Sequence, residues 1–221
     1  MWNKLIKQQL LYTSKNYKIN LVNISLGIII AWASVRNLTS NSSQAVIIKD
    51  IFSEYLFCFG LYPMLIFSTL YKASIRLNDI YVTRSRNILL QQIVIQFLEN
   101  LISILLPWVL TIELICQLKS LQFLIMKIEF IASFIYLILS FILIAIVTLL
   151  VYWLFFNKII SFIGSFVIVA ILFYYYITWY SGILYNFELT ITNWKVISEM
   201  IGIDILLFVL LEILVTQREI L

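Results

Sequence analysis

The most chemically varied stretch of this sequence is YKASIRLNDIYVTRSRN, residues 71–87, where basic and hydroxyl side chains gather between two long apolar segments. Ile75, Asp79 and Val82 in it have the spacing of a short helix. Basic side chains in such a place bind anionic lipid at a membrane surface or form charged contacts with a protein partner. We expect a cytoplasmic loop with one of these two uses. Its basic residues are Lys72, Arg76, Arg84 and Arg86.

A stripe of polar residues follows inside an otherwise apolar segment. Its members, spaced at i, i+4, i+7 and i+11 on one helical face, are Gln92, Gln96, Glu99 and Ser103. Polar side chains at membrane depth are costly unless they face protein or water. We expect the stripe to line a pathway or a subunit interface. Alternatively, the membrane span begins nearer residue 95, and the first glutamines lie among the headgroups of the inner leaflet.

The remaining charged residues do not form a catalytic cluster. Lys158, in a short turn between two apolar segments, is expected to pair with Glu212 on the same side of the membrane. Glu54 and Asp204 lie near the outer ends of their segments, where we expect solvation. The chain has no histidine, and its two cysteines lie in or beside apolar segments. We therefore predict no enzyme, and no catalytic, cofactor or metal site.

Long apolar segments must position these residues. The 221-residue chain is 63% hydrophobic and only 12% charged, which is typical of an integral membrane protein and not of a soluble domain. We predict an all-α, polytopic fold in which residues 1–221 form one transmembrane domain. An N-terminal amphipathic helix at 2–18 is expected in the membrane interface. The predicted spans are 19–35, 51–70, 90–112, 130–156, 159–180 and 200–216.

The distribution of lysine and arginine predicts the orientation. With a cytoplasmic N-terminus and six spans, the inner side holds most of the basic residues, as the positive-inside rule requires. Both termini are therefore expected in the cytoplasm, with the chain as a multi-pass protein of the cell membrane. We separately expect that membrane to be the plasma membrane of a bacterium. The net charge of +4 follows from this bias, so we expect contact with membrane lipid and not with nucleic acid. The expected inner residues are Lys4, Lys7, Lys15, Lys18, Lys72, Arg76, Arg84, Arg86, Lys158 and Arg218.

Two outer connections, 113–129 and 181–199, are apolar but carry a charge every few residues. They are either amphipathic segments that dip into the outer leaflet or ordinary interfacial loops. The sequence does not separate these alternatives.

This arrangement resembles a known family. Six spans, a basic entry helix and a charged loop between the second and third spans are similar to the permease subunits of ABC-2 exporters. The segment TRSRNILLQQIV (83–94) resembles the end of that loop, with Ser85 and Arg86 ahead of an apolar run. The chain departs from many relatives before this point, because residues 77–79 are LND where those relatives have an acidic residue and a glycine. A proline of those relatives is also missing.

The resemblance implies partners. The five glycines of the chain are scattered and none precedes a lysine, so the phosphate-binding pattern GxxxxGK[ST] is missing. ATP hydrolysis is therefore expected on a separate cytoplasmic ABC ATPase, with a second permease subunit completing a homodimer or heterodimer. The resemblance further implies export of an amphipathic peptide or lipid-like substrate. The residues implied to couple the loop to the ATPase are Ile75, Arg76, Asp79, Val82, Arg84 and Arg86.

Two other classes of function stay open. One is the substrate-binding membrane subunit of an energy-coupling-factor importer, for which we expect a small-xxx-small docking pattern in the first span and identify none. The other is a stand-alone membrane immunity or scaffold protein, which would need no ATPase.

Overall fold

The computed structural model describes residues 17–39, 44–74, 86–119, 121, 128–179, 182–187 and 194–217. Every regular element among them is helical, which confirms the predicted all-α class. The predicted interfacial helix at 2–18 lies almost entirely outside the described residues. The elements are α2 (Tyr17–Val35), α3 (Gln44–Ile51), α4 (Glu54–Leu56), a π-helical segment η1 (Phe57–Leu61), α5 (Tyr62–Ser74), α7 (Arg86–Leu118), α8 (Ile128–Phe155), α9 (Lys158–Trp179) and α10 (Trp194–Gln217).

Each predicted span falls largely on helix. Within the described residues, five helical stretches are long and apolar enough to cross a membrane: Tyr17–Val35, Val46–Ala73, Gln91–Leu118, Glu129–Phe155 and Lys158–Trp179. The segment predicted as a sixth span lies in α10, which is also a long helix but is interrupted by charged residues. The second and third spans are longer than predicted, because both helices continue into polar flanks that hydropathy alone does not assign to a span.

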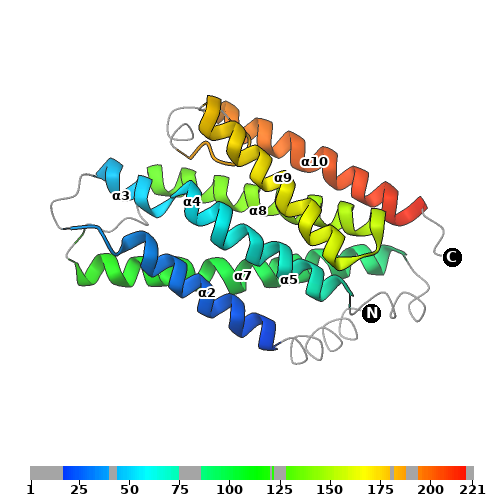
Figure 1. Ribbon diagram of the computed structural model, residues 1–221, viewed down its shortest axis with the longest axis horizontal. Coiled ribbons are helices and arrows are strands. Elements are labelled where there is room, and N and C mark those ends of the chain that lie inside the picture. Colours follow the sequence, from blue (N-terminus) through cyan, green and yellow to red (C-terminus); the bar gives the residue numbers. More distant parts are fainter. Residues whose placement is uncertain are drawn as a thin grey trace.

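The long segments run alternately in opposite directions (Figure 1). The right-hand end of that view, where α5 finishes and α7 begins, is called the loop end here, and the opposite end the far end. The starts of α2 and α9 also lie at the loop end (Figure 1). Helices α2 and α7 run in the same direction and pack extensively on each other, while α8 packs against α5, α9 and α10.

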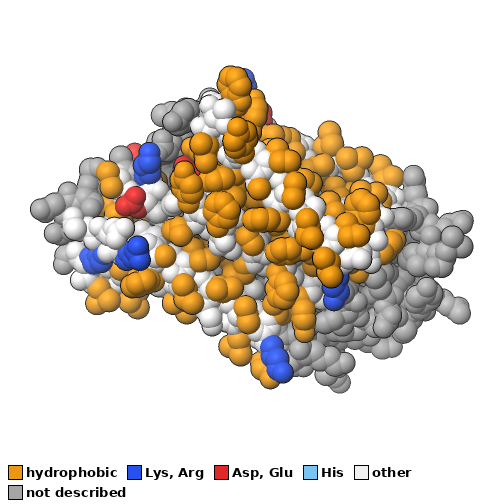
Figure 2. Space-filling model, in the orientation of Figure 1, with side chains coloured by type: hydrophobic (Ala, Val, Ile, Leu, Met, Phe, Trp, Pro, Cys, Tyr) orange, Lys and Arg blue, Asp and Glu red, His pale blue; other side chains and the backbone are white. Residues whose placement is uncertain are grey.

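Helix α7 has the opposite pattern to that of a soluble surface helix. Its polar side chains Gln92, Gln96 and Asn100 are buried in the protein. Figure 2 shows apolar side chains over most of the visible face. Because soluble helices bury their apolar face and expose the polar one, this pattern suits lipid as the surrounding solvent. The exposed stripe of α7 consists of Leu98, Ile102, Leu106, Leu110 and Leu114.

Proline shapes the second span. The Tyr62 amide donates to the Phe57 carbonyl five residues earlier, which is the π-helical pattern of η1. Pro63 follows immediately and has no amide hydrogen to donate, so the helix changes its hydrogen-bond pattern there. Pro107, in contrast, lies inside the continuous helix α7.

Close packing of α2 on α7 depends on a glycine. A methyl group added at Gly27 would lie 2.9 Å from the backbone oxygen of Ile104, so the two helices approach backbone to backbone. Ala31, one turn later, is fully buried. Gly27 and Ala31 form a small-xxx-small pair, so the expectation that the first span lacks this pattern is wrong. Because α7 of the same chain covers Gly27, this position is not open for docking another protein.

At the far end a lysine joins the same two helices. Lys119 Nζ donates to the carbonyl oxygens of Val35, Arg36 and Leu38, each at 2.8 Å. The last carbonyls of a helix have no partner within it, and a cation beside them also suits the helix dipole. Lys119 therefore caps α2 from the end of α7.

The connection before α10 packs into the protein in its described part. Leu184, Tyr185 and Phe187 are buried, and burial raises the pKa of the Tyr185 phenol well above its usual range. The Ile183 carbonyl accepts a hydrogen bond from Tyr136, and the Leu184 carbonyl one from Tyr62 at 3.3 Å. Residues 182–187 are thus neither a helix nor a free loop, while α10 begins at Trp194, inside the same predicted connection. The other outer connection, predicted at 113–129, begins as helix, because α7 extends to Leu118.

Candidate functional site: a buried polar cluster

The polar cluster lies between α2, α5 and α7, toward the loop end, and is centred on an ion pair. Lys72 Nζ on α5 lies 3.3 Å from Glu99 Oε2 on α7, with the lysine side chain fully buried and the glutamate side chain 19% exposed. Lys72 occupies the last turn of α5, where a cation suits the helix dipole. A buried lysine needs such a partner, because an uncompensated charge in this environment is expensive.

Helix α2 completes the cluster with two asparagines. Asn20 Nδ2 donates to Glu99 Oε1 at 2.7 Å, and Asn23 Nδ2 donates to Ser103 Oγ at 3.0 Å. Ser103 Oγ in turn donates to the Asn100 carbonyl at 2.9 Å. The carboxylate of Glu99 is therefore shared between α5 and α2, so one residue of α7 holds both neighbours.

The predicted polar stripe is part of this arrangement. Glu99 and Ser103 make the contacts above, while Gln92 and Gln96 are 5% and 6% exposed. Helix α7 starts at Arg86, before the first glutamine, and the alternative that the membrane span itself begins nearer residue 95 stays open. For Glu99 and Ser103, the partners that the structure gives belong to α2, α5 and α7 of the same chain. The prediction that the stripe lines a pathway or a subunit interface stays a prediction.

Several buried oxygen atoms in and near the cluster have no hydrogen-bond partner among the described residues. They are Asn20 Oδ1, Asn23 Oδ1, Asn100 Oδ1 and Thr69 Oγ1. Buried acceptors are normally satisfied by ordered water or by donors of a ligand. The chemistry available here is therefore binding of water or of hydrogen-bond donors.

Sequence reasoning missed three members of the cluster. The sequence predicts Lys72 in the cytoplasmic loop that follows the second span. In the structure α5 continues to Ser74, so Lys72 lies on this helix and is buried in the protein. Asn20 and Asn23 were not considered, although Asn20, Asn23 and Gly27 follow the i, i+3, i+7 spacing of one helical face. Two asparagines in an apolar helix are a usable signal, because polar groups there need partners.

The predicted coupling residues lie outside the described part of the chain. This holds for Ile75, Arg76, Asp79, Val82 and Arg84. Arg86 begins α7, but its side chain is likewise not described. Their docking role stays a prediction.

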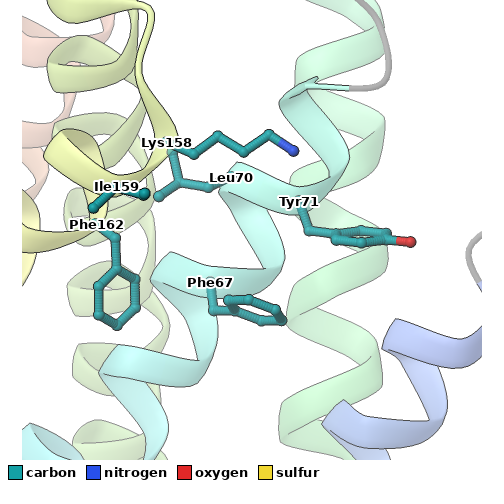
Figure 3. A pocket seen from close by; sticks show the side chains of 6 residues that line it. All are labelled: Phe67, Leu70, Tyr71, Lys158, Ile159 and Phe162. Atoms are coloured by element: carbon teal, nitrogen blue, oxygen red, sulfur yellow. The ribbon is translucent and has the colours of Figure 1, made fainter.

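The other predicted sites are placed as follows. Lys158 begins α9 and extends over Leu70 toward Tyr71 (Figure 3). Glu212 is exposed on α10, and the Lys158–Glu212 pair stays a prediction. Asp204 is buried in α10 at 6% exposure, so the expectation of solvation there is wrong.

Glu54, in the first turn of α4, accepts a hydrogen bond from Tyr176 Oη of α9 at 3.1 Å. The carboxylate therefore joins α4 to α9.

Within the described ranges, no three side chains of histidine, cysteine, aspartate or glutamate come together to hold a metal ion. Comparisons of the chain with protein-family models, curated proteins and solved structures give no match. The interpretation of the cluster therefore depends on its own geometry.

Proposed function

We propose that the chain is a membrane-spanning permease subunit of an ABC-type exporter, driven by a separate ATPase. Two copies, or this chain and a sister permease, would form the pathway for an amphipathic peptide or lipid-like substrate. The inverted polarity of α7 and the five long apolar stretches support placement in a membrane. The missing phosphate-binding loop supports a separate source of ATP hydrolysis.

The Lys72–Glu99 ion pair is the observation that carries the coupling part of the proposal. The two residues lie on α5 and α7, the helices on either side of the predicted loop at 75–85. An ATPase that moved this loop would also move the end of α5, and the ion pair would carry that displacement to α7. Asn20 extends the same connection to α2. Coupling of this kind needs a contiguous network between the driven element and the spans, and the cluster provides one.

The test is copurification of an ATP-binding protein with the full-length chain in mild detergent. The proposal expects an ATPase partner with the parent chain and none with the combined Arg76→Glu and Asp79→Arg variant. That variant keeps the net charge of the loop, so membrane insertion should be unchanged, but it reverses the charges that a docked partner would meet.

The control is a matched charge swap in the first turns of α10, away from the predicted loop. Lys195 and Glu199 are exposed on α10 and form an i, i+4 ion pair at 3.7 Å. Exchanging them also preserves net charge and should leave copurification intact. If the parent chain brings no ATP-binding protein, the stand-alone scaffold function replaces the exporter. If the Arg76/Asp79 swap retains its partner, these two residues do not dock the ATPase.

A further inference from the structure

A groove between α5 and α9 at the loop end combines apolar walls with a single cation. Its volume is about 330 Å³, and its lining is almost entirely apolar, with Lys158 as its charged residue and Tyr71 as its hydroxyl-bearing one. Figure 3 shows the Lys158 side chain crossing over Leu70 toward Tyr71, above the rings of Phe67 and Phe162. The charged nitrogen therefore lies at one edge of the groove, while the ring and aliphatic carbons line the remainder.

We propose that this groove binds an anionic phospholipid, with an acyl chain against Phe67 and Phe162 and the headgroup phosphate on the Lys158 ammonium. The inference goes beyond the exporter function and does not depend on it. Size agrees, because 330 Å³ lies at the lower end of the range of about 300–1,000 Å³ for small-molecule sites. Such a volume suits one chain of a lipid whose headgroup stays outside.

Charge complementarity supports an anionic headgroup. Lys158 is exposed, and the two ion pairs that the structure gives for described residues, Lys72–Glu99 and Lys195–Glu199, do not include it. It also lies in the first turn of α9, where the helix dipole disfavours a cation. Asn157 Oδ1 already accepts hydrogen bonds from the Ile159 and Ile160 amides, at 2.9 and 3.2 Å. The stability of α9 therefore does not explain why a lysine stands in its first turn, whereas binding of an anion beside Lys158 would explain it.

A second apolar groove provides an internal comparison. It lies between α7, α8 and α10, has a volume of about 250 Å³ and is lined only by apolar residues, Phe97, Leu98 and Phe208 among them. It offers a lipid chain similar walls without a charge. Lipid there should not be selected by its headgroup.

The experiment measures binding of short-chain phosphatidylglycerol and phosphatidylcholine to the purified full-length chain by native mass spectrometry. We expect the parent to prefer phosphatidylglycerol about fivefold, the ratio that one lysine near a membrane surface provides at about 1 kcal/mol. Lys158→Gln should remove the preference and Lys158→Arg should retain it. Lys18→Gln, which removes an exposed cation at the same end, should also retain it.

Two serine variants test the apolar part of the site. Phe67 and Leu98 are 51% and 48% exposed, so replacing either should leave the fold intact. Phe67→Ser should weaken binding of both lipids at the Lys158 groove, seen as loss of the Lys158-dependent preference, whereas Leu98→Ser should not affect that preference.

Three results would overturn the proposal. They are an unchanged preference in Lys158→Gln, an unchanged preference in Phe67→Ser, and displacement of phosphatidylglycerol by inorganic phosphate at equal concentration. The last would show a site for a free anion without an acyl chain.

Discussion

At the scale of single residues, the fully buried Lys72 defines the chemistry of this protein more than any residue of the exposed surface. Its ammonium is 3.3 Å from Glu99, and the same carboxylate accepts a hydrogen bond from Asn20. Replacing a buried pair by apolar residues is often tolerated, whereas removing one partner leaves an uncompensated charge. Comparing a variant that lacks one partner with a variant that lacks both therefore separates a structural role of the Lys72–Glu99 pair from a functional one.

We predict that Glu99→Leu alone strongly destabilises the protein, by about 3–5 kcal/mol, because Lys72 is left charged and buried. Combining it with Lys72→Met should restore most of that loss. Thermal unfolding in one detergent would measure both effects. Glu199→Leu is the control, since it breaks the exposed Lys195–Glu199 pair and should cost at most about 1 kcal/mol. Additive effects of the two cluster substitutions would show that the pair is not coupled in the folded protein.

The double variant also tests the pathway hypothesis. If the cluster only stabilises the bundle, Lys72→Met combined with Glu99→Leu should fold and retain transport. If the polar face takes part in coupling or lines a pathway, the folded double variant should lose transport. Copurification of the ATPase in the same preparation would distinguish loss of transport from loss of assembly.

At the scale of elements, the contact between α2 and α7 is the most extensive helix packing described. It joins the cluster at one end, the close approach at Gly27 in the middle and the Lys119 cap at the far end. Small residues at such contacts let helix backbones approach, which is a main source of stability between helices in a membrane. The close approach of the α7 backbone at Ile104 therefore requires a residue without a side chain at position 27.

We predict opposite outcomes for the same substitution at two glycines. Gly27→Ala adds a methyl group 2.9 Å from the Ile104 oxygen and should destabilise the protein by about 1–3 kcal/mol. Gly202→Ala in α10 meets no atom within 4 Å and should be neutral or stabilising by up to about 1 kcal/mol, since alanine favours helix. Unfolding temperatures measured side by side would compare them. Equal temperatures for the two variants would mean that α2 is not seated on α7 at Gly27.

The helices also show which features of the fold can be predicted from the sequence. Apolar runs locate each long helix within several residues, because hydropathy and length are local properties. The spacing of Gln92, Gln96 and Glu99 predicts that one face of α7 avoids lipid, and these residues do face protein. The partner Lys72 is not predictable in this way, because its burial depends on where α5 ends and on how α5 packs against α7. Burial of residues 184–187 likewise goes with hydrogen bonds from Tyr62 and Tyr136, both distant in sequence.

At the scale of the whole molecule, the alternating helix directions place the start of α2 and the end of α5 at the same end of the bundle (Figure 1). The proposed coupling therefore requires that the loop end face the cytoplasm, where ATP is available. Half of the ten basic residues that support that orientation lie in residues 1–16 and 75–85, outside the described part. The orientation thus has to be measured on the intact chain in a membrane.

We predict that thiol labelling in intact cells will place the start of α2 inside and its end outside. The native cysteines should give little background labelling, because Cys58 and Cys116 are both buried and should not react with a membrane-impermeant maleimide. Tyr17 at the start of α2 and Asn37 two residues beyond its end are both exposed, so each can carry a single added cysteine. Asn37→Cys should label in intact cells, and Tyr17→Cys only after permeabilisation. The reverse result would place the loop between α5 and α7 outside the cell, beyond reach of a cytoplasmic ATPase, and the exporter proposal would fail with it.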